Sequence, residues 1–184
     1  MDAFSFFGFE RRPLVDEVSL KERYLQLAAL RHPDVSGGDD ERFHQLQEAY
    51  GILRDPAARL RHLRDLQFSV HGGQDGTVPD AELFLKASRA VQAAKAVALR
   101  SKSATSAVVR AVGASEAATI LLQVREALKA IEEPRARLGA NLQALDKQWP
   151  EVTSRELTDL ASSFMFLSKW TSELSEWEFR LTHD

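Results

Sequence analysis

The sequence predicts an all-α protein with two helical domains. Apolar residues recur at spacings of three and four through most of the 184 residues, and runs that alternate apolar with polar residues are nearly absent. One long interruption breaks this pattern at residues 69–79, where three glycines and a proline supply the chemistry of a loop. We therefore expect a first domain over residues 1–68, a linker over 69–79 and a second domain over 80–184.

The first domain begins with a short helix and a long one. Asp2 can cap the short helix, which Gly8 ends. The long helix spans about residues 16–31 and stops before Pro33, because the residue preceding a proline is pushed out of helical geometry. Its apolar stripe consists of Leu20, Tyr24, Leu27 and Ala28.

A second long helix follows the loop and carries a matching apolar stripe, made of Phe43, Leu46, Tyr50 and Leu53. Two such helices joined by a short loop predict an antiparallel hairpin. Asp55 and Pro56 end the hairpin and open a short fourth helix that reaches about Gln67. Aspartates interrupt the basic run around this helix, which favours an ordinary solvated face for Arg54, Arg59, Arg61 and Arg64.

The second domain is predicted to be an antiparallel bundle of three or four helices. Asp80 caps a helix that runs past Arg100 and ends at Gly113 at the latest. Another helical segment begins at Ser115, is interrupted at Pro134 and can resume as far as Trp149. The last helix opens with a capping box and continues in apolar residues at helical spacing; the box is Thr153-Ser154-Arg155-Glu156.

Composition argues against several classes of partner and cofactor. The net charge of −3 gives neither the basic field of a nonspecific nucleic-acid binder nor attraction to anionic lipid, so we expect neither partner. Without cysteine, the chain has no thiolate ligand for zinc or an iron–sulfur cluster. The histidines show no metal-ligand spacing either. We therefore expect no metal site and no cofactor.

The sequence also argues against catalysis and against membrane insertion. It contains no phosphate-binding glycine loop and no nucleophile elbow. The apolar N-terminal stretch lacks a preceding basic region, and no stretch approaches the roughly 20 apolar residues that a spanning helix needs. We expect a cytoplasmic protein that is not an enzyme.

The tripeptide His32-Pro33-Asp34 lies in the loop of the predicted hairpin. Proline fixes the backbone angle, histidine offers a donor or an acceptor, and aspartate can accept a charge-assisted hydrogen bond from an arginine. With the matching stripes on both arms, this segment resembles the J-domain (DnaJ-like) family. Taken one at a time, His32 and Asp34 can also be explained as caps of a helix end and a turn.

The resemblance implies that the tripeptide loop docks on an Hsp70 and triggers the ATPase of that partner. J-domains usually carry basic residues on the helix before the tripeptide, and here Lys21, Arg23 and Arg31 occupy that helix. Leu25 and Gln26 stand at positions that are commonly basic, which implies weaker attraction and favours a specialised, HscA-like Hsp70. The same cations also fit an ordinary solvated helix face.

Over its full length the chain is similar to the iron–sulfur cluster co-chaperones of the HscB family. The similarity rests on the opening residues 1–9, on residues 166–169, and on the lack of a Gly/Phe-rich segment or a zinc module after the J-domain. It implies a C-terminal three-helix domain that binds the cluster scaffold protein through Phe84, Leu85 and Phe166. These three apolar residues fit the core of a helical bundle equally well.

Alternatives for the function remain open at the level of sequence. The chain departs from the HscB pattern in the charges of residues 86–89, which leaves a J-domain co-chaperone for a different client as one alternative. A structural adaptor whose J-like hairpin does not act on Hsp70 is the other.

Overall fold

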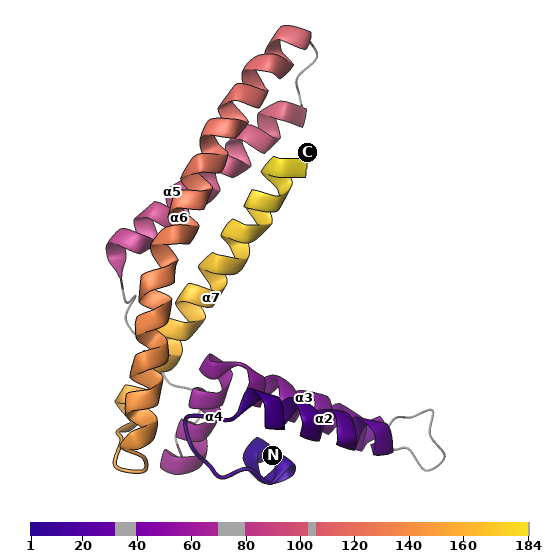
Figure 1. Cartoon of the computed structure of the whole chain (residues 1–184), viewed down its shortest axis with the longest axis vertical. Helices are drawn as coiled ribbons and strands as arrows, with labels where there is room; N and C mark the ends of the chain where they lie inside the picture. Colours follow the sequence, from indigo (N-terminus) through magenta and orange to yellow (C-terminus); the bar gives the residue numbers. More distant parts are fainter. Residues whose placement is uncertain (32–39, 70–79, 103–105, 184) are drawn as a thin grey trace. The chain divides into compact units, whose positions relative to one another are not determined.

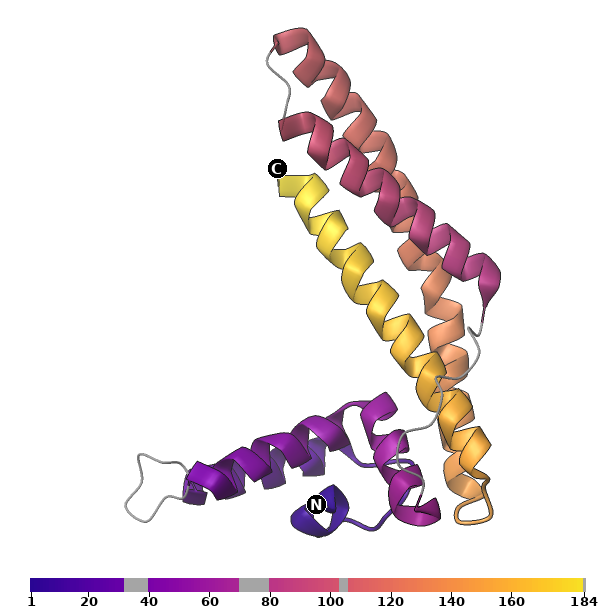
Figure 2. The same ribbon diagram turned by 180° about the vertical axis from the view of Figure 1, so that it is seen from behind.

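The computed structural model describes residues 1–31, 40–69, 80–102 and 106–183. Every regular element in these ranges is a helix, which confirms the all-α prediction (Figure 1, and from behind in Figure 2). The helices are α1 (Ala3–Phe7), α2 (Glu17–Arg31), α3 (Asp40–Arg54), α4 (Pro56–Phe68), α5 (Ala81–Lys102), α6 (Ala107–Lys147) and α7 (Ser154–His183).

Contacts divide the chain into two compact units. The first contains Met1–Thr77 and Leu138–Phe164, and the second contains Val78–Arg137 and Met165–Asp184. The end of α6 and the beginning of α7 therefore belong with the N-terminal helices. The predicted division at a linker stays a prediction, because residues 70–79 lie outside the part of the chain that the structure describes.

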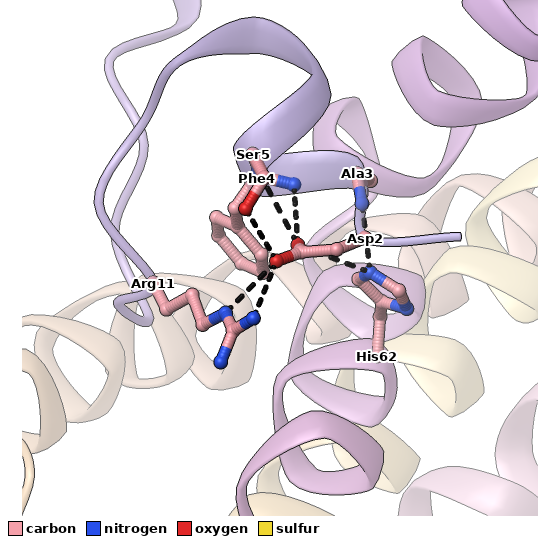
Figure 3. A network of polar contacts seen from close by, with 6 residues as sticks. All are labelled: Asp2, Ala3, Phe4, Ser5, Arg11 and His62. Carbon is pink, nitrogen blue, oxygen red and sulfur yellow. Dashed lines mark hydrogen bonds and ion pairs between the residues drawn. The ribbon is translucent and has the colours of Figure 1, made fainter.

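Asp2 organises the first helix of the N-terminal unit, as its position in the sequence predicts (Figure 3). Its Oδ1 accepts hydrogen bonds from the backbone N–H groups of Phe4 at 3.0 Å and Ser5 at 3.3 Å. Its Oδ2 accepts from the Ser5 hydroxyl at 2.6 Å and from Arg11 Nε at 2.9 Å. Gly8 then ends α1 with a φ of 72°, a left-handed conformation that glycine adopts without strain.

His62 fastens α1 to α4. The backbone N–H of Ala3 donates to His62 Nε2 at 3.0 Å, and the imidazole stacks on the Phe4 ring with 6.0 Å between centroids (Figure 3). Burial lowers the pKa of His62 from its ordinary value of 6.5, although the nearby Asp2 carboxylate opposes this shift. Because Nε2 accepts a hydrogen bond here, the bond requires a neutral imidazole.

The buried arginines of α4 correct the prediction of a solvated basic face. Arg59 is 2% exposed and Arg64 is 5% exposed. Arg59 Nε donates to the carbonyl oxygen of Pro13 at 2.8 Å, and its Nη1 donates to the carbonyl oxygen of Leu53. Arg64 donates to Asp65 and to Thr158. Leu53 lies in the last turn of α3, where backbone carbonyls lack a helical partner and can accept from a guanidinium, and Pro13 lies in the segment before α2. The charge pattern of the sequence did not reveal these acceptors.

Asp146, near the end of α6, joins that helix to the segment before α2. Both oxygens of its carboxylate accept hydrogen bonds from Arg12, and Oδ1 also accepts from the backbone N–H of Leu14 at 2.9 Å. Partial burial acts to raise the pKa of Asp146, but the bonds from Arg12 and Leu14 outweigh it and hold that pKa below its ordinary value.

The helix α6 runs through both residues that were expected to end helices. Gly113 lies inside it and Pro134 does not interrupt it, so the predicted break at Pro134 is wrong. A proline in a helix interior costs about 3 kcal/mol. Buried side chains on both sides of it, Ile131 and Leu138, supply packing that offsets this cost. The preceding helix, α5, ends at Lys102.

The capping box of α7 is confirmed. The N–H and hydroxyl of Thr153 both donate to Glu156 Oε2 at 2.7 Å, and the Glu156 N–H donates back to Thr153 Oγ1 at 3.2 Å. In the second unit, ion pairs link α7 to its neighbours at Lys95–Glu173 and Arg125–Glu178. The helices α5, α6 and α7 therefore form the predicted bundle, here with three helices (Figures 1 and 2).

We predict that the free energy of unfolding falls as the pH drops below about 6.5. A histidine whose pKa is lowered in the folded state contributes stability that is present above its unfolded pKa and is lost as the pH falls through the folded one. Urea unfolding at pH 7.5 and pH 5 should show the loss. The His62→Gln variant should lose less unfolding free energy than the parent between pH 7.5 and pH 5, whereas His44→Gln, which changes an exposed histidine, should lose as much as the parent. If His62→Gln loses as much as the parent, the assignment to His62 is contradicted.

We predict that Asp146→Ala lowers the free energy of unfolding by about 2 kcal/mol at pH 7, since hydrogen bonds to a buried charged acceptor are lost. A carboxylate with a lowered pKa stabilises the fold above its unfolded pKa, and this contribution disappears as the pH falls through the folded value. Urea unfolding curves of variant and parent should therefore begin to converge as the pH falls below about 4. Glu132→Ala, at an exposed position of α6, is the control and should change little.

Candidate functional site

The two arms of the hairpin, α2 and α3, bury one face against each other. Leu20 on α2 is 1% exposed, and Leu46 and Leu53 on α3 are fully buried. Tyr24 and Tyr50 stack across the two arms with ring centroids 4.2 Å apart and planes inclined by 24°. This aromatic pair fixes the register of the arms, because offset stacking holds the rings in a narrow range of geometries.

The residues of the tripeptide lie outside the described part of the chain. The described part of α2 ends at Arg31 and that of α3 begins at Asp40, so His32, Pro33 and Asp34 follow the last described residue of α2 in the sequence. Arg31 is the last residue of α2, and its side chain is not described.

Lys21 and Arg23 lie on the exposed surface of α2. Sequence reasoning missed an apolar component of that surface: Val18 is 65% exposed and Leu25 is 55% exposed. Together with Lys21 and with Tyr50 and Arg54 of α3, these residues line an open groove along the hairpin. The Arg54 guanidinium carbon lies 5.7 Å from the centre of the Tyr50 ring. In the sequence, only Leu25 at a commonly basic position pointed to this groove. The groove also depends on how α3 is aligned with α2, because Tyr50 and Arg54 of α3 line it.

The three C-terminal residues singled out in the sequence lie on two neighbouring helices. The rings of Phe84 on α5 and Phe166 on α7 stack with 6.4 Å between centroids. Both rings contact Trp170, which is 8% exposed, at centroid distances of 5.7 Å from Phe84 and 6.4 Å from Phe166. Phe84 itself is 39% exposed and Leu85 is 50% exposed. The patterns in the sequence did not predict this aromatic cluster.

Residues 3–62 match the family model of the DnaJ domain. The chain carries a DnaJ domain. Curated relatives agree over the same region: the chaperone protein DnaJ of Caulobacter vibrioides is 36% identical over 78 residues, and that of Hyphomonas neptunium is 41% identical over 66 residues. These matches cover 41% and 34% of this chain but only 20% and 17% of the relatives, so the chain spans about one fifth of their length.

Two solved structures share the fold over nearly the whole chain. The chaperone HscB from Vibrio cholerae superposes with a TM-score of 0.58 at 20% identity, covering 98% of this chain and 99% of that one. Human co-chaperone protein HscB superposes with a TM-score of 0.60 at 16% identity, covering 96% and 81% of the two chains. The architecture is therefore a DnaJ domain followed by a helical region of HscB type.

Two further properties concern only the residues that the structure describes. No helix among them is long and apolar enough to cross a membrane. No group of three or more histidine, aspartate or glutamate side chains gathers there in a way that could hold a metal ion.

We predict different stability effects for the two neighbours on α5. Phe84→Ala should lower the free energy of unfolding by about 1–2 kcal/mol, less than a buried phenylalanine costs, because its ring is partly exposed yet packs on Trp170. Leu85→Ala should change it by no more than about 0.5 kcal/mol. Chemical unfolding measures both, and an equal cost for the two would contradict the description of Leu85 as a surface residue.

Proposed function

We propose that this chain is a co-chaperone that binds an Hsp70 through the loop of its DnaJ domain and stimulates ATP hydrolysis by that Hsp70. The observation that carries the proposal is the DnaJ-domain match over residues 3–62, in which His32-Pro33-Asp34 follows directly after α2. The chain itself is then a trigger and not an enzyme, and its place of action is the cytoplasm.

In the proposed mechanism, the packed hairpin is the rigid part of the domain that carries the tripeptide. Leu20, Tyr24 and Tyr50 hold the two arms together, so α2 and α3 keep a fixed position relative to each other. Asp34 would accept a charge-assisted hydrogen bond from an arginine of the partner. Binding stimulates the Hsp70 by favouring the conformation in which its own catalytic groups are aligned, which is a shift of the partner's population.

Cations along α2 would steer the encounter. Lys21, Arg23 and Arg31 precede the tripeptide, and we assign them to the Hsp70-binding face together with it. The exposed Val18 and Leu25 support a face that relies more on apolar contact than on long-range attraction. This balance fits a specialised, HscA-like Hsp70.

For the client we propose an iron–sulfur cluster scaffold protein. Support comes from the HscB-type fold and from the aromatic pair on α5 and α7, where Phe84, Leu85 and Phe166 would form the contact. Partly exposed aromatic rings over a buried tryptophan have the character of an interface anchor. A different client is the second candidate, favoured by Lys86 and Arg89 beside this pair.

We predict that the parent protein stimulates single-turnover ATP hydrolysis by an Hsp70 of its host and that His32→Gln abolishes the stimulation. Loss of the loop contact removes the differential affinity on which a population shift depends. In a parallel set, adding the host's iron–sulfur scaffold protein should increase the rate further, and Leu85→Ala or Phe166→Ala should reduce that increase.

The matched control is His183→Gln, which removes an exposed histidine outside the DnaJ domain. It should stimulate as the parent does. A parent that stimulates none of the host's Hsp70 proteins would leave the adaptor function as the explanation of the fold. Stimulation without any effect of the scaffold would point to a different client.

A further inference from the structure

An apolar patch on the second unit is made of Phe84, Leu85, Met165 and Phe166. The exposed fractions are 39% for Phe84, 50% for Leu85 and 38% for Met165. The patch is supported from below by Trp170, whose ring meets the Phe84 ring edge-on with an interplanar angle of 86°. Aromatic side chains held in this way offer contact area without a large loss of conformational freedom on binding.

The rim of the patch is basic. Arg89 lies one turn after Leu85 on α5, with Lys86 beside it, and both are exposed. Lys169 lies one turn after Phe166 on α7, and its Nζ is 6.0 Å from the centre of the Trp170 ring. In the described part of the chain, Lys86 and Arg89 make no ion pair.

Few acidic groups offset these cations. Within one turn of the patch on either helix, Asp80 uses its carboxylate to cap α5, accepting from the N–H of Leu83 at 2.9 Å. Glu82, exposed one turn before Lys86, is the other acid and offsets one of the three cations. Glu173, further along α7, is held by Lys95 at 2.9 Å. The chain as a whole carries a net charge of −3, so a basic rim here opposes the overall balance.

We propose that the protein that docks on this patch presents carboxylates around an apolar anchor. The inference rests on the proposed client-binding function and adds to it the charge of the partner's surface. An apolar group fills the space over Phe84 and Phe166, while carboxylates meet Arg89, Lys86 and Lys169. Arginine can hold a carboxylate with two parallel hydrogen bonds, which adds geometric selection.

Charge complementarity favours an acidic partner and disfavours a basic one. Charges at the edge of an interface act mainly on the rate of encounter and on the choice between partners, because solvent weakens each pair. A partner with lysines or arginines around its anchor would place like charges against the rim on both helices. The apolar patch determines where the partner binds, and the basic rim selects a partner whose surface is negatively charged there.

The test uses two fluorescein-labelled helical peptides with identical apolar positions, one flanked by glutamates and the other by lysines. Fluorescence anisotropy with the full chain should give a dissociation constant about tenfold lower for the acidic peptide at low salt, as expected for several rim charges acting together. The difference should shrink at 1 M salt, where the screening length is about 3 Å.

Two charge variants distinguish an effect of the rim cations on peptide binding from an effect of the net charge of the protein. The double variant Lys86→Glu, Arg89→Glu should weaken the acidic peptide about fivefold to tenfold. The control, Lys129→Glu with Arg135→Glu, changes the net charge equally at exposed positions of α6 and should bind as the parent does. Phe84→Ala should weaken both peptides alike. Circular dichroism checks that all variants are folded.

Equal or tighter binding of the basic peptide, binding of neither peptide, or no effect of the rim variant would each overturn the inference. These failures are distinct from failure of the proposed function. A chain that stimulates Hsp70 but prefers the basic peptide refutes the acidic partner alone. A chain that prefers the acidic peptide but stimulates no Hsp70 refutes the co-chaperone function alone.

Discussion

The position of Arg59 constrains the whole DnaJ domain. Its guanidinium is buried, and each of its bonds ends on a backbone carbonyl: that of Pro13, ahead of α2, and that of Leu53, in the last turn of α3. A buried cation without such acceptors would cost several kcal/mol, so the two chain segments must stay where the guanidinium can reach both. One side chain of α4 thereby holds the segment before α2 and the last turn of α3 together.

The helices of the N-terminal unit follow from local signals in the sequence, whereas its polar core does not. Asp2, Gly8 and Asp55 act as caps where their positions indicate, because capping depends on residues only two or three positions away. Arg59 and Asp146 find their partners across the fold, at sequence separations of 46 for Arg59 to Pro13 and 134 for Asp146 to Arg12. Nothing in a local window identifies such a partner, which is why the basic run of α4 looked solvated.

Pro134 is a second case in which local sequence signals miss the effect of packing. The local cost of a proline predicts a break, yet α6 continues because the buried residues around it gain more by staying in one helix. At the candidate sites, the resemblance to known families singled out Lys21, Phe84 and Leu85 as candidates, which stay predictions. It could not show that Phe84 and Phe166 stack, because that contact depends on the register of α5 against α7. The geometry of the tripeptide itself remains a prediction from the sequence.

Both candidate surfaces combine an aromatic support with exposed cations, and the two components have different physical roles. On the hairpin, Tyr24 and Tyr50 pack across the arms while Lys21 and Arg23 point into solvent. On the bundle, Trp170 is buried while Lys86 and Arg89 are exposed. Exposed charges contribute little to folding, so selection for a partner can alter them without loss of the fold. This separation explains how a chain with only 20% identity to a solved HscB protein shares that fold while carrying its own pattern of surface charge.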